Sequence, residues 1–329
     1  MNSYLKKKFS IYFLTFFVAI TIDWAIPRFM PGNPVALLMG RFAAMPGSRQ
    51  LMMSYFTEAF GLNKPLLTQY IDFWKAFFHG DLGVSLYLYP KPVMEVIKEA
   101  IPYDLMLLLP SILLSWIVGN KLGAYAIKNK FVEKVIIPLS YFFTAMPYFW
   151  FAIILAWFLG VVNPIFPISG AYSYSINPEW SVDFILDFLS HWILPFLSLF
   201  MVMLGGWAIG MRNMIIYEVE SNYSRYMRSL GLSQRLRLNY AYKNALLPQI
   251  TGLALQLGTI VAGALTTEVV FSYPGIGYLL LQAILHQDYF LIQGCFLFIV
   301  LGVLIANFIV DIVYVLIDPR VKASFVEGA

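Results

Sequence analysis

The chain has 329 residues, of which 60% are hydrophobic, 17% aromatic and 12% charged, with a formal net charge of +4. Soluble domains carry about 45–50% apolar and about 25% charged residues, so this composition could not solvate the surface of a soluble fold. The small net charge does not indicate a nucleic-acid-binding protein. The single cysteine, Cys295, lies in an apolar run, which excludes a disulfide within the chain and argues against a metal cluster. The composition predicts an integral membrane protein.

Six apolar stretches are long enough to cross about 30 Å of hydrocarbon, which takes roughly 20 helical residues. They are expected at 10–29, 103–127, 135–162, 191–211, 245–270 and 290–317. The third stretch carries Pro138 and Pro147, which we expect to bend it. The chain is therefore predicted to be an all-α membrane protein with six transmembrane helices.

Lysine and arginine residues accumulate in short cytoplasmic loops, and this rule sets the expected orientation. With both termini inside, the outside loops at 163–190 and 272–289 hold no basic residue, and the inside segments hold most of them. A cleaved signal peptide is the alternative for the first stretch, but the sequence Pro27-Arg28-Phe29-Met30-Pro31-Gly32 lacks a small-residue cleavage site. We expect a retained first helix and both termini in the cytoplasm.

Three regions follow from this pattern: residues 1–30 with the first helix, an extracytoplasmic domain at 31–102, and a five-helix core at 103–329. Residues 51–78 predict amphipathic helices broken at Gly61-Leu62-Asn63-Lys64-Pro65. Turns are expected at Pro31-Gly32-Asn33-Pro34 and Gly80-Asp81-Leu82-Gly83. The absence of two matching halves disfavours a secondary transporter built from inverted repeats.

The longest inside loop, residues 212–247, has a helical pattern of its own. Tyr223, Tyr226, Met227 and Leu230 fall on one helical face, and Gly231 follows where a helix C-terminal glycine belongs. Ser233 can then cap a second helix. Such a helix either lies along lipid headgroups or fits a groove on a cytoplasmic partner.

The segment from Tyr226-Met227-Arg228-Ser229-Leu230-Gly231-Leu232-Ser233 to Lys243-Asn244-Ala245-Leu246-Leu247-Pro248 resembles the EAA loop of ABC importer permeases. Its spacing from Gly231 to Pro248 is about one helical turn longer than in maltose-type permeases and is similar to the dipeptide/oligopeptide branch. Further stretches resemble that branch in the same order: Met30–Pro34, Gly61–Pro65, Gly80–Ser85, Glu268–Gly277, Asp288-Tyr289, and Asp311 through Asp318-Pro319-Arg320. Met227 and Ser229 replace residues that are usually small, and Tyr273 stands where tryptophan is usual.

The resemblance implies the permease subunit of a binding-protein-dependent importer with the type I fold. It implies as partners a second, homologous permease in a heterodimer, two cytoplasmic ABC ATPases, an extracytoplasmic solute-binding protein and the lipid bilayer. ATP and Mg²⁺ would bind the ATPases, since this chain has no Gly-x-x-x-x-Gly-Lys phosphate loop, and no cofactor or enzymatic activity is expected here. The favoured substrates are di- and oligopeptides, with oligosaccharides and nickel chelates as alternatives.

Two sets of candidate site residues follow. The coupling set comprises Tyr223, Arg225, Tyr226, Met227, Leu230, Gly231, Leu232, Asn244, Leu246 and Pro248. The pathway set comprises the ionisable residues expected at membrane depth and a nearby turn: Asp23, Glu268, Asp311, Pro274 and Gly275. Interhelical hydrogen bonding is the alternative role for the three carboxylates.

The sequence gives little support to three rival kinds of function. His79, His191 and His286 are too scattered to predict a metal site. A stand-alone secondary transporter would need its intramembrane charges to form a relay, and a membrane enzyme would need a convergent catalytic set.

Overall fold

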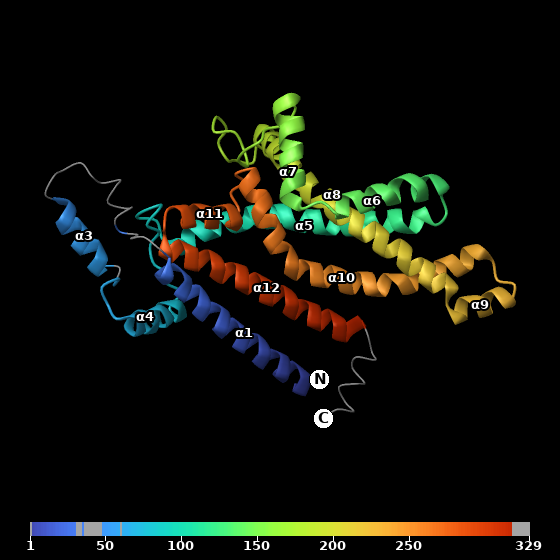
Figure 1. Ribbon diagram of the computed structural model, residues 1–329, viewed down its shortest axis with the longest axis horizontal. Coiled ribbons are helices and arrows are strands. Elements are labelled where there is room, and N and C mark those ends of the chain that lie inside the picture. Colours follow the sequence, from blue (N-terminus) through green and yellow to red (C-terminus); the bar gives the residue numbers. More distant parts are fainter. Residues whose placement is uncertain (1, 31–34, 36–47, 60, 318–329) are drawn as a thin grey trace. The chain divides into compact units, whose positions relative to one another are not determined.

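The computed structural model describes residues 2–30, 35, 48–59 and 61–317, with some side chains inside the helices left out (Figure 1). The regular secondary structure of the described part is helical, and one isolated bridge joins Val84 and Pro92. In chain order, the helices are α1 (Asn2–Phe29), α3 (Ser48–Ala59), α4 (Leu66–Phe78), α5 (Val93–Ala126), the π-helical turn η1 (Val132–Ile136), α6 (Ile137–Thr144), α7 (Tyr148–Ala156), the π-helical turn η2 (Trp157–Val162), α8 (Val182–Glu220), α9 (Asn222–Ser229), α10 (Gln234–Val270), α11 (Ile276–Leu285) and α12 (Tyr289–Ile317).

Four described helical segments are long and apolar enough to cross a membrane: Lys8–Phe29, Val93–Ala126, Val182–Glu220 and Tyr289–Ile309. A fifth is formed if the pair Val132–Thr144 and Tyr148–Val162, bent by 105°, counts as one span. The remaining predicted stretch lies within α10, several of whose side chains are outside the described set. The all-helical membrane class is confirmed, and each predicted apolar stretch coincides with helix.

The two prolines of the third stretch act differently. Pro147 immediately precedes α7 and lies at the bend, where its missing N–H and fixed φ interrupt the helix. Pro138 lies in the first turn of α6, directly after the π-helical turn η1, and the helix continues through it. The bend expected at Pro147 is present, whereas Pro138 does not interrupt the helix.

Helix α5 begins earlier than the apolar stretch predicted, because its first turns are amphipathic. Val93, Val96, Ile97 and Ala100 are buried at helical spacing, and charged residues occupy the exposed positions between them. A search for uninterrupted apolar sequence therefore misses these turns.

The chain divides into two compact units. Among the described residues, the first unit contains 103–273 and 305–317, and the second contains 2–102 and 274–304. The predicted start of the five-helix core at residue 103 coincides with a unit boundary, and segment 274–304 groups with the N-terminal region. The three-region division of the sequence stays a prediction.

The second unit holds the two amphipathic helices expected before the core. They are separated by a turn in which Gly61 has φ +64°, as the Gly-Leu-Asn-Lys-Pro sequence predicts. Helix α4 packs on α1 through aromatic side chains, with the rings of Phe17 and Trp74 stacked at 5.3 Å. The turn expected at Gly80–Gly83 is also present, and the Gly83 N–H donates to Asp81 Oδ1 at 2.8 Å. The turn expected at Pro31–Pro34 lies outside the described residues.

The first unit places α8 and α10 against each other, with the short helix α9 beyond their connected ends (Figure 1). Its core includes Leu194, Leu199 and Met203 of α8, all buried. Arg212 of α8 forms an ion pair with Glu133 of η1, its Nε donating to both carboxylate oxygens at 2.9 Å. The unit thus combines a packed helical core with a projecting helical corner.

Candidate coupling segment and membrane cavity

Helix α9 and its C-terminal turn have the local structure that the sequence predicts. The Leu230 N–H donates to the Tyr226 carbonyl at 3.1 Å, and the Leu232 N–H donates to the Met227 carbonyl at 3.1 Å. Gly231 between them has φ +77°, a conformation that residues with a Cβ resist. The Ser233 hydroxyl accepts from the Leu236 N–H at 3.3 Å and caps α10. The corner between α9 and α10 is therefore fixed by backbone and capping bonds.

Glu218, near the end of α8, links α8 to both α9 and α10 through hydrogen bonds. The sequence does not predict this role. Glu218 Oε2 accepts hydrogen bonds from the Tyr223 hydroxyl of α9 at 2.8 Å and from the Asn244 amide of α10 at 3.3 Å. Burial raises the pKa of Tyr223, and the bond to the carboxylate raises it further. Two predicted coupling residues are thus brought together by a carboxylate at the base of α9.

The predicted apolar face of α9 is only partly covered. Tyr223 and Met227 are half-buried, whereas Tyr226 and Leu230 are 65% and 59% exposed. Arg225 is also exposed. Tyr223 and Met227 thus pack α9 against the rest of its unit, whereas Tyr226 and Leu230 on the same face are exposed.

The remaining coupling candidates lie in the turn and on α10. Leu232 is exposed in the turn, and Leu246 packs on the buried cluster that includes Met211, Ile215 and Ala245. Pro248 is inside α10 and lines a cavity further along the helix. The predicted coupling residues therefore extend from an exposed corner into helix α10.

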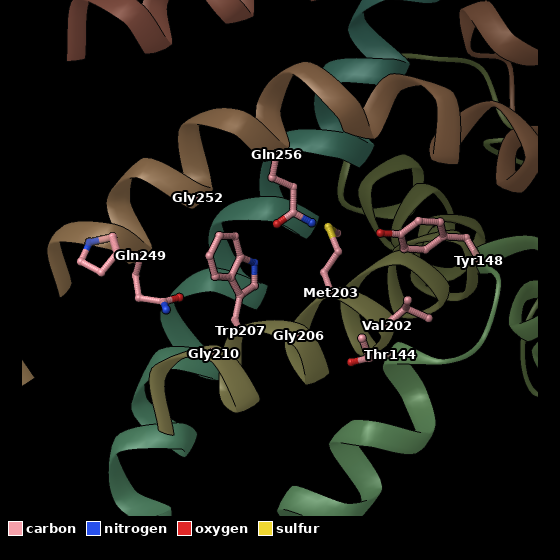
Figure 2. A pocket seen from close by; sticks show the side chains of 11 residues that line it. Thr144, Tyr148, Val202, Met203, Gly206, Trp207, Gly210, Gln249, Gly252 and Gln256 are labelled. Atoms are coloured by element: carbon pink, nitrogen blue, oxygen red, sulfur yellow. The ribbon is translucent and has the colours of Figure 1, made fainter. Parts of the chain in front are cut away.

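That cavity has a volume of about 400 Å³ and lies among α6, α7, α8 and α10 (Figure 2). Its side chains include Thr144, Tyr148, Met203, Trp207, Gln249 and Gln256. Gly206, Gly210 and Gly252 leave room on the facing helices. None of the residues that line it is charged.

The pathway candidates are not among the residues that line this cavity. Asp23 is 3% exposed in the second unit, and neither carboxylate oxygen has a hydrogen-bond partner in the described part of the chain. Glu268 is buried in the first unit, whereas Pro274 and Gly275 belong to the second and precede α11. The Asp311 side chain lies outside the described residues. The prediction of these carboxylates depends on their charge at membrane depth, and a charge criterion does not detect an uncharged cavity.

Residues 111–323 match the family described as binding-protein-dependent transport system inner membrane component. The chain belongs to this family. The match covers more than half of the chain and includes the coupling segment and every residue that lines the cavity.

Whole-length relatives agree with this assignment. The di/tripeptide transport system permease protein of Pseudomonas aeruginosa is 32% identical, covering 98% of this chain and 99% of its own length. The oligopeptide transport system permease protein of Bacillus subtilis is 29% identical over 98% and 100% of the two chains. The nickel import system permease protein of Staphylococcus aureus is 29% identical over 92% and 87%.

Membership of the inner membrane component family determines the general role of this chain. It is a multi-pass inner-membrane component of a transport system and is not an enzyme. No cofactor is expected in this chain, and a binding protein and an ATPase are implied as partners.

Proposed function

We propose that this chain is one of two permease subunits of an ATP-driven importer for di- and oligopeptides. In this proposal, it crosses the membrane six times with both termini in the cytoplasm, pairs with a second, homologous permease and is driven by two cytoplasmic ABC ATPases. The extracytoplasmic domain at 31–102 helps to dock the solute-binding protein.

The proposed coupling role is supported mainly by the partial exposure of the apolar face of helix α9. Its inner side is held by the hydrogen bond from Tyr223 to Glu218, while Tyr226 and Leu230 remain exposed. An apolar helical ridge beside basic residues fits a hydrophobic groove on a protein partner. We assign to the ATPase contact the exposed coupling residues of α9 and its C-terminal turn, and to its support Tyr223, Asn244 and Leu246.

The proposed mechanism transmits motion from the ATPases to the membrane through this corner. ATP binding closes the ATPase pair and moves α9, and the capped turn at Gly231 and Ser233 passes the movement to α10. Because α8 and α10 also line the cavity, displacement of α9 changes its walls. Alternating opening to the two sides then moves the solute inward.

Peptides are the favoured substrate class because the di/tripeptide and oligopeptide permeases match almost the whole chain. The similarity to a nickel import permease makes nickel chelates the second candidate. Oligosaccharides are the third alternative. A stand-alone secondary transporter would need neither an ATPase nor a second permease.

Co-purification of the tagged chain in mild detergent tests this proposal. We expect two ATPase subunits and a second permease to accompany it and the eluate to hydrolyse ATP. Reconstitution with the binding protein and labelled dipeptides, oligosaccharides or nickel chelates then identifies the substrate. A chain that purifies alone, without ATPase activity, would overturn the importer assignment, whereas uptake of nickel chelate alone would overturn only the peptide assignment.

A further inference from the structure

The cavity between α8 and α10 contains a buried hydrogen-bond donor and a buried acceptor without partners. Trp207 is 9% exposed and Gln249 is 6% exposed. Within the described part of the chain, neither the Trp207 indole nitrogen nor the Gln249 Oε1 atom has a hydrogen-bond partner. Buried polar groups in proteins are nearly always satisfied, so these two atoms are candidates to bond a polar group that enters the cavity.

Glycines hold these two side chains at the cavity. A Cβ atom at Gly252 of α10 would lie 3.1 Å from the Trp207 ring, so the indole packs directly on the helix backbone. A Cβ atom at Gly210 of α8 would lie 3.2 Å from the Gln249 amide nitrogen, so this side chain lies over α8. Each polar residue therefore crosses to the facing helix at a position without a side chain (Figure 2).

The backbone behind Gln249 is fixed independently. The Trp116 indole of α5 donates to the Gln249 carbonyl at 3.0 Å. That bond holds the Gln249 backbone of α10 against α5, and the Gln249 residue lines the cavity from this position.

We propose that Trp207 and Gln249 recognise the peptide unit of the solute during its passage. The indole N–H donates to the peptide carbonyl, and Gln249 Oε1 accepts from the peptide N–H. This inference rests on the proposed function and deepens it by naming the chemical group that is read. The lining has no charge, so it recognises the backbone common to all peptides and does not select among charged side chains.

An amide-to-ester exchange in the solute tests the Gln249 contact directly. Complete complexes in proteoliposomes, with their ATPases, second permease and binding protein, are compared for transport of alanyl-alanine and alanyl-lactate, whose ester lacks the N–H. In the unaltered complex, we expect the ester to move about 3- to 10-fold more slowly, the range for one neutral hydrogen bond. Gln249→Leu slows the amide solute by the same factor and leaves the ester unchanged, so the amide-to-ester ratio falls by that factor relative to the unaltered complex. The binding protein is the same throughout and cancels from the comparison between variants.

A matched tryptophan pair tests the donor. Trp207→Phe keeps the ring and removes the N–H, and we expect dipeptide transport to fall about 3- to 10-fold. Trp192→Phe makes the same change on the same helix, but its N–H already donates to the Met106 carbonyl at 3.0 Å, and transport is expected to be unchanged. Thermal unfolding of each complex in detergent separates a transport defect from loss of folding.

The outcomes of these experiments separate failure of the peptide-unit contact from failure of the proposed function. Equal amide-to-ester ratios in the unaltered complex and in Gln249→Leu would overturn the peptide-unit contact. Loss of the second permease from the purified variants would also overturn it, because the cavity would then be a packing surface for a partner helix. If the unaltered complex takes up no peptide at all, the peptide assignment of the proposed function fails.

Discussion

Gly231 has a positive φ where its neighbours carry the hydrogen bonds that end α9. Its φ is +77°, and an added Cβ would meet nothing within 4 Å. Replacement therefore introduces backbone strain without a steric clash. Because the strain acts at the turn between α9 and α10, we expect it to affect the proposed coupling more than folding.

Gly231→Ala is expected to reduce solute uptake about fivefold while the ATPases continue to hydrolyse ATP. A left-handed alanine costs about 1–2 kcal/mol, which shifts the turn away from its docked geometry. Uptake and ATP hydrolysis measured on the same proteoliposomes check this outcome. Gly80→Ala is the matched control, since Gly80 has φ +73° and equally open space but lies outside the coupling segment. Equal losses in both variants would contradict the assignment of Gly231 to coupling.

At the scale of elements, Glu218 determines how α9 is held between α8 and α10. Helix α9 has only eight residues and is too short to be stable alone in water. Its position depends on the Tyr223 and Asn244 bonds to one carboxylate and on the packing of its half-buried face.

Glu218→Ala is expected to loosen α9 and weaken ATPase docking, because hydrogen bonds to a charged group contribute about 1.5–3 kcal/mol. Hydrogen exchange at the amides of α9 is expected to quicken by about tenfold or more, with reduced ATPase retention during purification. Tyr223→Phe removes one of the two bonds and should have the smaller effect. Glu220→Ala removes the same charge from an exposed position nearby and serves as the control. Unchanged exchange in Glu218→Ala would show that packing alone holds α9.

At the scale of the whole molecule, the distribution of charge predicts which loops face the cytoplasm. Lys130 is exposed in the basic loop after α5, and Ser175 is exposed in the loop before α8, which has no basic residue. The single native cysteine, Cys295, is buried, so it provides a low background for thiol labelling.

We expect a membrane-impermeant maleimide to label Ser175→Cys from outside intact cells and to label Lys130→Cys only after permeabilisation. The difference follows from the accumulation of basic residues on the cytoplasmic side. The unaltered chain controls for reaction at Cys295. The reverse labelling pattern would refute the proposed orientation.

Local patterns in the sequence determined where many of the helices, bends and helix ends lie. Apolar length placed the membrane helices, and Pro147 placed the bend in the third stretch. The spacing of Tyr223 to Leu230 with Gly231 and Ser233 predicted α9 and both of its ends. These features depend on residues within one or two helical turns, so a single sequence contains the information.

Only the tertiary structure decided which distant residues meet. Glu218 contacts Asn244, and Trp207 lies against Gly252, because α8 and α10 pack together after the chain has turned through α9. Nothing in the local pattern distinguishes Trp207, whose indole N–H has no described partner, from Trp192, whose N–H is satisfied. The sequence alone predicted the family, the apolar helices and the local structure of α9 with its C-terminal turn. The neutral cavity depended on packing between helices, where hydrogen-bond satisfaction is set in three dimensions.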